Sequence, residues 1–305
     1  MDYKLELLDI NIPTFERFES FSTVMLEIEN DLNLLSNNHK NMVKVNIFDN
    51  NSSTSNHKQQ LCDEIRSRSN LNIHFSKNDM NIGADNNIKK CCESASESLF
   101  TWVLCDDDHI VKAGIPKIVS ILLEHRDKLG LLIITGEGYR CNPILKDKLF
   151  KSYEEFARLA IKYQPDILIS HALVSSNIFR SKLFDSDEAT YVIEKLTPRE
   201  GLSASLAHMR GILKGIFRNN DEYSVLMPSS IHLSTSIRLP GEINLHDEMP
   251  NIYYFYFLWL LIELGVRVDE VPHHKPLWWL SSPKELRGFR KWFRSPLVQR
   301  RKASY

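Results

Sequence analysis

The sequence predicts an α/β fold built around a mostly parallel central sheet. Short apolar runs alternate with amphipathic segments along the first half of the chain, and most runs end in turn-forming or charged residues. The composition is that of a globular protein, since 43% of the 305 residues are hydrophobic and 25% are charged. These values exclude a collagen-like chain, a disulfide scaffold and a wholly disordered protein.

The first half of the chain alternates strand and helix patterns. Leu5–Ile12 alternates and is stopped by Pro13, which predicts a strand. Apolar side chains then recur at helical spacing through Arg17–Leu35. Val43–Phe48 is apolar and leads into a run of turn formers, so it is a second predicted strand. By the same patterns we expect helices at 59–68, 83–96 and 116–125, and strands at 71–75, 99–105 and 131–135. Strands that alternate with helices in this way pair in parallel through right-handed crossovers.

The second half of the chain is less regular. It predicts helices at 153–163, 203–217 and 252–264 and strands at 167–170 and 223–227. The longest apolar run, 252–262, has 11 residues. A bilayer needs about 20, so we expect a buried helix there.

The cysteines and the first residues indicate the compartment. Five cysteines make an odd number, and no two form a C-x-x-C pair. This argues against a zinc ribbon and against a secreted disulfide framework. The opening MDYKLELLDINIP has no basic segment followed by an apolar one, so we expect no signal peptide and a cytoplasmic location.

Polar residues follow four predicted strands, at the point where each strand ends. They are 13–17, 49–55, 77–83 and 106–108. Ligands of an open parallel sheet bind outside the carboxyl ends of its strands. We therefore expect these four segments to meet at one edge and form a binding site.

Asp106 and Asp108 have the chemistry of a divalent-metal site. Mg²⁺ and Mn²⁺ take oxygen ligands, and they are often held by one or two carboxylates together with substrate phosphates. Side chains two residues apart on a strand point the same way, so these two could share one ion while Asp107 faces away. The alternative is a solvated acidic turn. Placing three carboxylates side by side is costly without a counter-ion, which favours the metal.

Four segments in order resemble the motifs of family 2 glycosyltransferases. IPTFER at 12–17 is similar to the family's I-P-T-Y-N-R opening, and NIFDNNSS at 46–53 to its V-D-N-x-S segment. Asn81-Ile82-Gly83 with Asn87 resembles N-x-G-x-x-x-N, and LCDDD at 104–108 resembles the L-D-x-D metal motif. The resemblance implies a GT-A fold that binds a nucleotide sugar, with residues 1–135 as the donor half and 136–270 as the acceptor half.

The resemblance also implies roles for single residues. The nucleoside pocket would be lined by Pro13, Thr14 and Arg17, and the base would bind Asp49. The loop beneath it would be shaped by Asn81 and Gly83. Asp106 would meet the ribose and the metal, and Asp108 would hold Mn²⁺ or Mg²⁺ against the diphosphate. A UDP-sugar is the expected donor, with GDP- and CDP-sugars as alternatives. Glu16 stands where the family often has Asn.

The sequence leaves the catalytic base open. Candidates are Asp187, Glu188, Glu200 and His208, which follow a segment, 170–184, similar to the acceptor side of bacterial O-antigen and capsule transferases. Inverting transfer needs such a group within hydrogen-bond reach of the acceptor hydroxyl, whereas retaining transfer does not. His246 is a further candidate metal ligand.

A basic, aromatic segment closes the chain. Residues 284–302 carry a net charge of +7, which leaves −8 on the rest, and 278–302 interleaves aromatic with basic side chains. We expect this tail, 271–305, to lie at an anionic membrane surface, where an enzyme would meet a lipid-linked saccharide acceptor. A solvated tail is the alternative. No nucleic-acid partner is expected, because the acidic body would repel one.

Other classes of protein remain as competing hypotheses. A sugar nucleotidyltransferase or a phosphohydrolase could use the same carboxylates, but a nucleotidyltransferase would need a Gly-rich basic loop where IPTFER stands. A non-enzymatic membrane-docking module would not need the aspartates. No G-x-G-x-x-G follows the first strand, which disfavours a NAD dehydrogenase.

Overall fold

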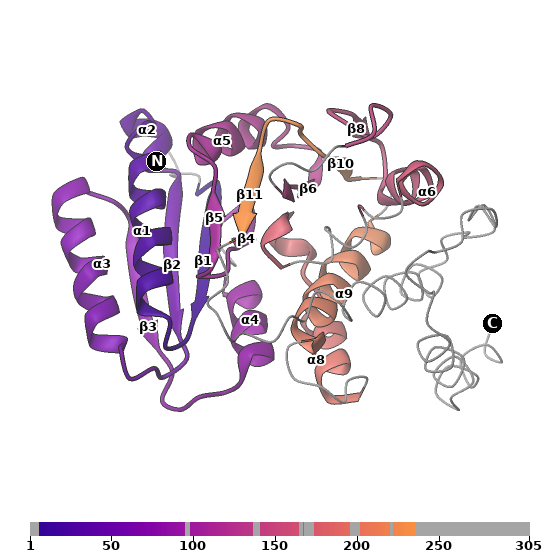
Figure 1. Cartoon of the computed structure of the whole chain (residues 1–305). Coiled ribbons are helices and arrows are strands. Elements are labelled where there is room, and N and C mark those ends of the chain that lie inside the picture. The colour runs from indigo at the N-terminus through magenta and orange to yellow at the C-terminus, as the bar shows by residue number, and fades with distance from the viewer. Residues whose placement is uncertain are drawn as a thin grey trace, which may run out of the picture.

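An eight-stranded, mostly parallel sheet lies at the centre of the protein (Figure 1). The computed structural model describes residues 6–94, 98–136, 141–164, 167, 174–195, 202–219 and 222–235, and the statements below concern these residues. The strands are β1 (Leu8–Thr14), β2 (Val43–Asp49), β3 (Ile73–Lys77), β4 (Phe100–Val103), β6 (Leu129–Ile133), β8 (Leu149–Phe150), β9 (Asn177–Arg180) and β10 (Ser224–Leu226).

The strand order is β3-β2-β1-β4-β9-β6-β10-β8. Strands β1 to β4 pair in parallel, as do β6 and β10. Strand β9 is antiparallel to both β4 and β6, and β8 is antiparallel to β10. The carboxyl ends of β1, β2, β3 and β4 therefore share one edge of the sheet, while β9 returns the chain to the opposite edge.

Helices cover both faces of the sheet and enclose two apolar cores. One core contains side chains from α1 (Phe18–Leu32), α3 (Ser55–Ser69) and α5 (Gly114–Glu124). The other contains side chains from α4 (Ala84–Glu93), α6 (Tyr153–Tyr163), α8 (Ser186–Lys195) and α9 (Leu202–Arg218). Neighbouring strand residues divide between the cores, since successive side chains point to opposite faces. Trp102 belongs to the first core and Val103 to the second.

A second, three-stranded sheet lies beside the aspartate triplet. Its order is β5 (Asp108–Ile110), β11 (His232–Thr235) and β7 (Thr135–Gly136). Strand β11 is antiparallel to β5, with Thr235 opposite Asp108. This small sheet fixes the direction of the chain immediately after the triplet.

The α/β class and the parallel order of the first four strands are confirmed. Strand β1 extends through Pro13 to Thr14 instead of ending before the proline. Proline is tolerated there because the described pairing of β1 with β4 covers only Leu8–Asn11. The predicted strand at 167–170 is wrong at Ile167, which is helical, and its other residues lie outside the described ones. So does the expected helix at 252–264.

Several short elements were not predicted: α2 (Asn37–Lys40), β5, β8, β9, α8 and β11. Strands β9, β10 and β8 come from beyond residue 135 and pair within the same large sheet as β1 to β4. The two halves of the chain therefore share one sheet. Among the described residues, no helix combines the length and the apolar character that crossing a membrane requires.

Candidate functional site

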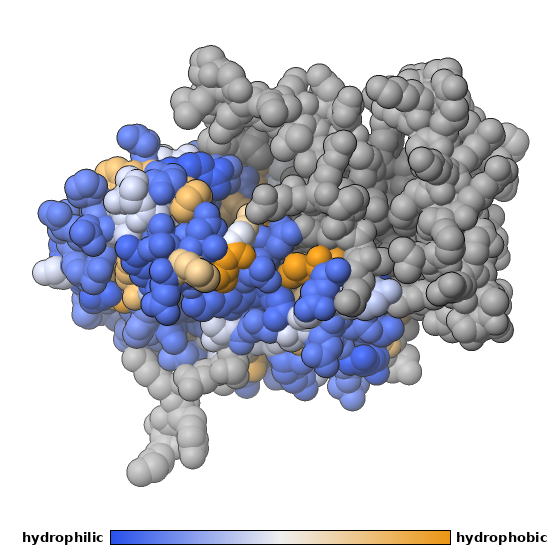
Figure 2. All heavy atoms as spheres, turned by 90° about the horizontal axis from the view of Figure 1, so that it is seen from below, coloured by the Kyte–Doolittle hydropathy of each residue, from blue (hydrophilic) through white to orange (hydrophobic). Residues whose placement is uncertain are grey.

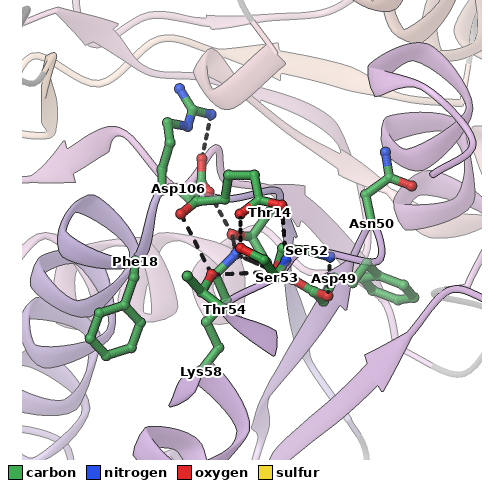
Figure 3. A network of polar contacts seen from close by, with 12 residues as sticks. Thr14, Phe18, Asp49, Asn50, Ser52, Ser53, Thr54, Lys58 and Asp106 are labelled. Carbon is green, nitrogen blue, oxygen red and sulfur yellow. Dashed lines mark hydrogen bonds and ion pairs between the residues drawn. The ribbon is translucent and has the colours of Figure 1, made fainter. Parts of the chain in front are cut away.

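The carboxyl ends of β1, β2 and β4 bring their polar residues into one bonded network (Figure 3). In Figure 1 the loop between β3 and α4 lies at the lower end of the sheet, which is the same edge. Figure 2 views the molecule from that side, and the described surface there is mostly hydrophilic. The predicted convergence of the strand ends is therefore confirmed for β1, β2 and β4.

Asp106 lies at the centre of this edge. Its side chain is fully buried and accepts a hydrogen bond from Thr14 Oγ1, with 2.6 Å between Oγ1 and Oδ2. The guanidinium of Arg17, which is about half exposed, pairs with the carboxylates of both Asp106 and Asp107. Burial raises the pKa of Asp106, against the opposite effects of Arg17 and Thr14. Asp106 is thus a buried carboxylate whose cationic partner is half exposed.

Asp49, at the end of β2, lies in a second part of the same network. It accepts from the backbone N–H of Ser52 at 3.0 Å and from the Ser52 hydroxyl at 2.5 Å. The ammonium of Lys58 lies 3.2 Å from Asp49 Oδ1 and 2.9 Å from Thr14 Oγ1. Both charged side chains are fully buried. A buried carboxylate of this kind is held by its ion pair and by the loop that folds over it.

Asn50 connects β2 to the loop that follows β3. Its amide nitrogen donates to Asn81 Oδ1 at 2.7 Å and to the Gly83 carbonyl at 3.3 Å, and its Oδ1 accepts from Ile82 N at 2.9 Å. Gly83 has a φ of 81°, which favours glycine because it has no Cβ. Asn81 and Gly83 therefore lie in the loop beside Asn50, directly before α4.

The three aspartates do not alternate as expected, because residues 106 and 107 form a turn instead of continuing β4. Asp107 does not face away from Asp106, since both bind Arg17. Ligand atoms of Cys105, Asp107 and Asp108 lie within 4.8 Å of one another. Burial raises the pKa of Asp108 to about 6 and that of the Cys105 thiol well above its usual range. The two carboxylates suit Mn²⁺ or Mg²⁺, whereas a neutral thiol is a poor ligand.

Two base candidates, Asp187 and Glu188, lie at the other edge of the sheet. Strand β9 pairs its last residue, Arg180, with the first residue of β4, so the chain reaches α8 near the amino ends of the strands. The hydroxyl of Ser186 there bonds to Glu93, at the end of α4. Glu188 also pairs with Arg210 at 2.6 Å. The structure thus separates both candidates from Asp106.

His208 lies on α9 inside the second core. It is 1% exposed, and neither ring nitrogen has a hydrogen-bond partner among the described residues. Burial lowers its pKa to about 3, and its ring packs edge-on against Phe179. A general base must reach its substrate, so this placement opposes that role. Glu200 and His246 lie outside the described residues.

Sequence reasoning missed Lys58 and left Glu16 without a role. Helix α3 begins at Ser55, four residues before the predicted start, so Lys58 is a helical residue that faces the site. Glu16 accepts from the backbone N–H of Ser53 at 2.8 Å and from its hydroxyl at 2.6 Å. It therefore ties the loop after β1 to the loop after β2. The signal for Lys58 was the run of cap-forming residues before it, which moves the helix start forward.

Comparison with known proteins gives a structural likeness only. No protein-family model matches the chain, and no curated protein sequence matches it. The crystal structure of residues 1–349 of S. aureus TarS is similar with a TM-score of 0.54 at 15% identity, over 87% of this chain and 67% of that one. The structure of TarS 1–349 in complex with UDP-GlcNAc has a TM-score of 0.51 at 15% identity, over 87% and 68%.

A longer TarS structure has a TM-score of 0.50 at 16% identity, and the likeness covers 87% of this chain but only 41% of that one. At such identities the likeness concerns the arrangement of helices and strands. The large, mostly parallel sheet flanked by helices matches the GT-A glycosyltransferase fold.

Proposed function

We propose that the protein is a metal-dependent glycosyltransferase that moves a sugar from a nucleotide diphosphate sugar to a saccharide acceptor. One observation carries the proposal: Thr14, Asp49 and Asp106, at or just after the ends of three neighbouring strands, form one bonded network with Lys58 at the carboxyl edge of a GT-A sheet. A structure with this fold was solved with UDP-GlcNAc. This supports a UDP-sugar as the donor, with GDP- and CDP-sugars as alternatives to be tested.

The nucleoside is proposed to bind across the ends of β1 and β2. Pro13, Thr14 and Arg17 would line one side, and Asp49 would meet the base. Asn81 and Gly83 would shape the loop below it, and the bonds from Asn50 to both residues support this. Arg17 offers a fork of N–H donors, which suits a diphosphate as well as the carboxylates it now binds.

The metal site is proposed at Asp106 and Asp108, although the cluster of close ligand atoms holds Asp108 with Asp107 and Cys105 and does not include Asp106. Bound there, Mn²⁺ or Mg²⁺ would supply positive charge to the departing diphosphate. Asp106 would hold the ribose and keep its contact with Thr14. Because Asp187 and Glu188 follow β9 at the other edge and His208 is buried in the core, Glu200 stays the candidate base and His246 a candidate ligand.

Binding measurements test this function. Titration calorimetry with UDP, GDP and CDP should show binding of one nucleotide that depends on Mn²⁺ or Mg²⁺. Asp108→Ala should abolish the metal dependence, because it removes a carboxylate from the site. Asp127→Ala is the matched control, since Asp127 is an exposed carboxylate two residues before β6, at the amino edge. Full metal-dependent binding by Asp108→Ala, or none by the natural protein, would refute the proposal.

The biological setting of the enzyme is a separate proposal. We place the enzyme in bacterial surface-polysaccharide assembly, at the inner face of the cell membrane, with a lipid-linked saccharide as acceptor. The net charge of +7 over 284–302 supports this, because anionic lipid attracts basic segments. Replacing Arg287, Arg290 and Arg294 by Gln should reduce sedimentation of the protein with anionic vesicles and leave nucleotide binding intact. Unchanged sedimentation would refute the membrane role.

A further inference from the structure

Lys58 is a buried cation whose three hydrogen bonds all go to residues at the carboxyl edge of the large sheet. Its side chain is fully buried. Its ammonium lies 2.9 Å from Thr14 Oγ1, 3.2 Å from Asp49 Oδ1 and 3.2 Å from Ser52 Oγ (Figure 3). An ammonium has three donors and no acceptor, so each of its N–H groups has a partner. A buried, fully bonded ammonium has little freedom, and its position fixes the atoms around it.

The bond from Lys58 determines what Thr14 can do. A hydroxyl has a single proton, and an ammonium can only donate. Because Thr14 Oγ1 accepts from Lys58, its own proton is available for Asp106 Oδ2, which lies 2.6 Å away. Hydrogen bonds along these contacts are therefore donated in one direction, from Lys58 to Thr14 and from Thr14 to Asp106. Without Lys58, Thr14 Oγ1 would lose the donor whose bond leaves its own proton to Asp106.

We propose that Lys58 is a positioning residue for donor binding, which acts on Asp106 through the Thr14 hydroxyl. This role rests on the proposed function, because Asp106 has to meet a nucleotide sugar for its position to matter. Lys58 does not contact the donor itself. It neutralises Asp49, orients Thr14 and so presents a fixed oxygen of Asp106 at the site.

A purely structural role makes a different prediction. Lys58 also lies over the ring of Phe21, 5.7 Å from its centre, and bonds the loop after β2. If these contacts were its whole contribution, its removal would lower the free energy of unfolding and leave the site's affinity in the folded protein unchanged. The two roles therefore separate when affinity and stability are measured on the same variants.

The experiment is a double-mutant cycle on the full chain, with UDP and Mn²⁺ as probes in titration calorimetry. Lys58→Met keeps the length of the side chain and removes the charge, and Thr14→Val removes the hydroxyl. We expect each single change to raise the Kd for UDP about tenfold, and the double variant to be no weaker than Thr14→Val alone. Thr14→Ser keeps the hydroxyl and should bind within about twofold of the natural protein.

The outcomes are distinct. Effects that multiply in the double variant, or a Lys58→Met protein that loses stability but binds UDP normally, overturn the positioning role alone. Failure of the natural protein to bind any nucleotide with metal overturns the proposed function and this role with it. If Lys58→Met does not fold, Lys58→Leu takes its place in the cycle, since Leu also has no hydrogen-bond donor for Thr14.

Discussion

Replacing His208 by Leu tests whether this histidine belongs to the core or to the chemistry. The side chain is 1% exposed, both ring nitrogens lack partners among the described residues, and burial lowers its pKa to about 3. Leucine fills a similar volume and removes two unpaired polar atoms. At neutral pH we therefore expect the variant to be at least as stable as the natural protein, because unpaired buried polar groups cost about 1–3 kcal/mol.

The sign of the pH effect follows from the two states of His208. In the unfolded chain its pKa is near the usual 6.5, and in the folded protein it is about 3. Between these values the unfolded state binds a proton that the folded state does not, so stability falls as pH falls below about 6.5. The free energy of unfolding changes by at most about 1.4 kcal/mol per pH unit, so the stability lost between about pH 6.5 and pH 5 is about 2 kcal/mol.

Urea denaturation at several pH values between neutral and mildly acidic measures this difference. The natural protein should lose more stability on acidification than His208→Leu, by about 2 kcal/mol at pH 5. His57→Leu is the control, since it removes an exposed histidine of α3 and should keep the natural slope. If stability changed equally with pH in the natural protein and in His208→Leu, this histidine would not be buried in its neutral form. If His208→Leu kept its full stability but lost nucleotide binding, His208 would have to be counted among the residues of the candidate site.

Three further changes have effects set by the structure. Gly215→Ala should cost about 3 kcal/mol or more in thermal denaturation, because an added Cβ would lie 1.7 Å from the Leu183 carbonyl oxygen; an unchanged Tm would contradict the packing of α9. Asp31→Ala should cost about 1–2 kcal/mol in urea, since Asp31 accepts from two backbone N–H groups at the start of α5, at 2.8 and 2.9 Å. Asp31→Asn, which keeps an acceptor, should cost less. Affinity for Mn²⁺ should fall about tenfold per pH unit below the Asp108 pKa of about 6, because the metal binds the carboxylate and not the protonated acid. An affinity that calorimetry finds unchanged from about pH 7 to pH 5 would refute Asp108 as a ligand.

The donor half of the fold was predictable because its signals are local. Strands such as Val43–Asp49 are apolar runs closed by turn formers, and their helical partners repeat apolar residues at helical spacing. Strand β9 was missed for the opposite reason. Asn177–Arg180 has four residues, all buried, and its strand geometry depends on lying between β4 and β6. Nothing within four residues of sequence encodes neighbours so far away in the chain.

The candidate site shows the same division. The sequence correctly indicated that Thr14, Asp49 and Asp106 lie together, because parallel strands end at one edge. It did not indicate that Lys58 joins them, since that needs the true start of α3 and the packing of this helix against α1 and β3. It also left the base open among four candidates, and two of these, Asp187 and Glu188, follow β9, whose antiparallel run carries the chain to the far edge before α8 begins.

The residues that end the strands, and the chemical groups they carry, can be recognised in the sequence alone. Which of these groups face one another depends on how the loops and helices pack. Asp107 illustrates the reason: in a strand it would point away from Asp106, but a turn at 106 and 107 brings both to Arg17. Local propensity fixes the backbone within a few residues, whereas the direction of a side chain at a strand end depends on the loops and helices packed around it.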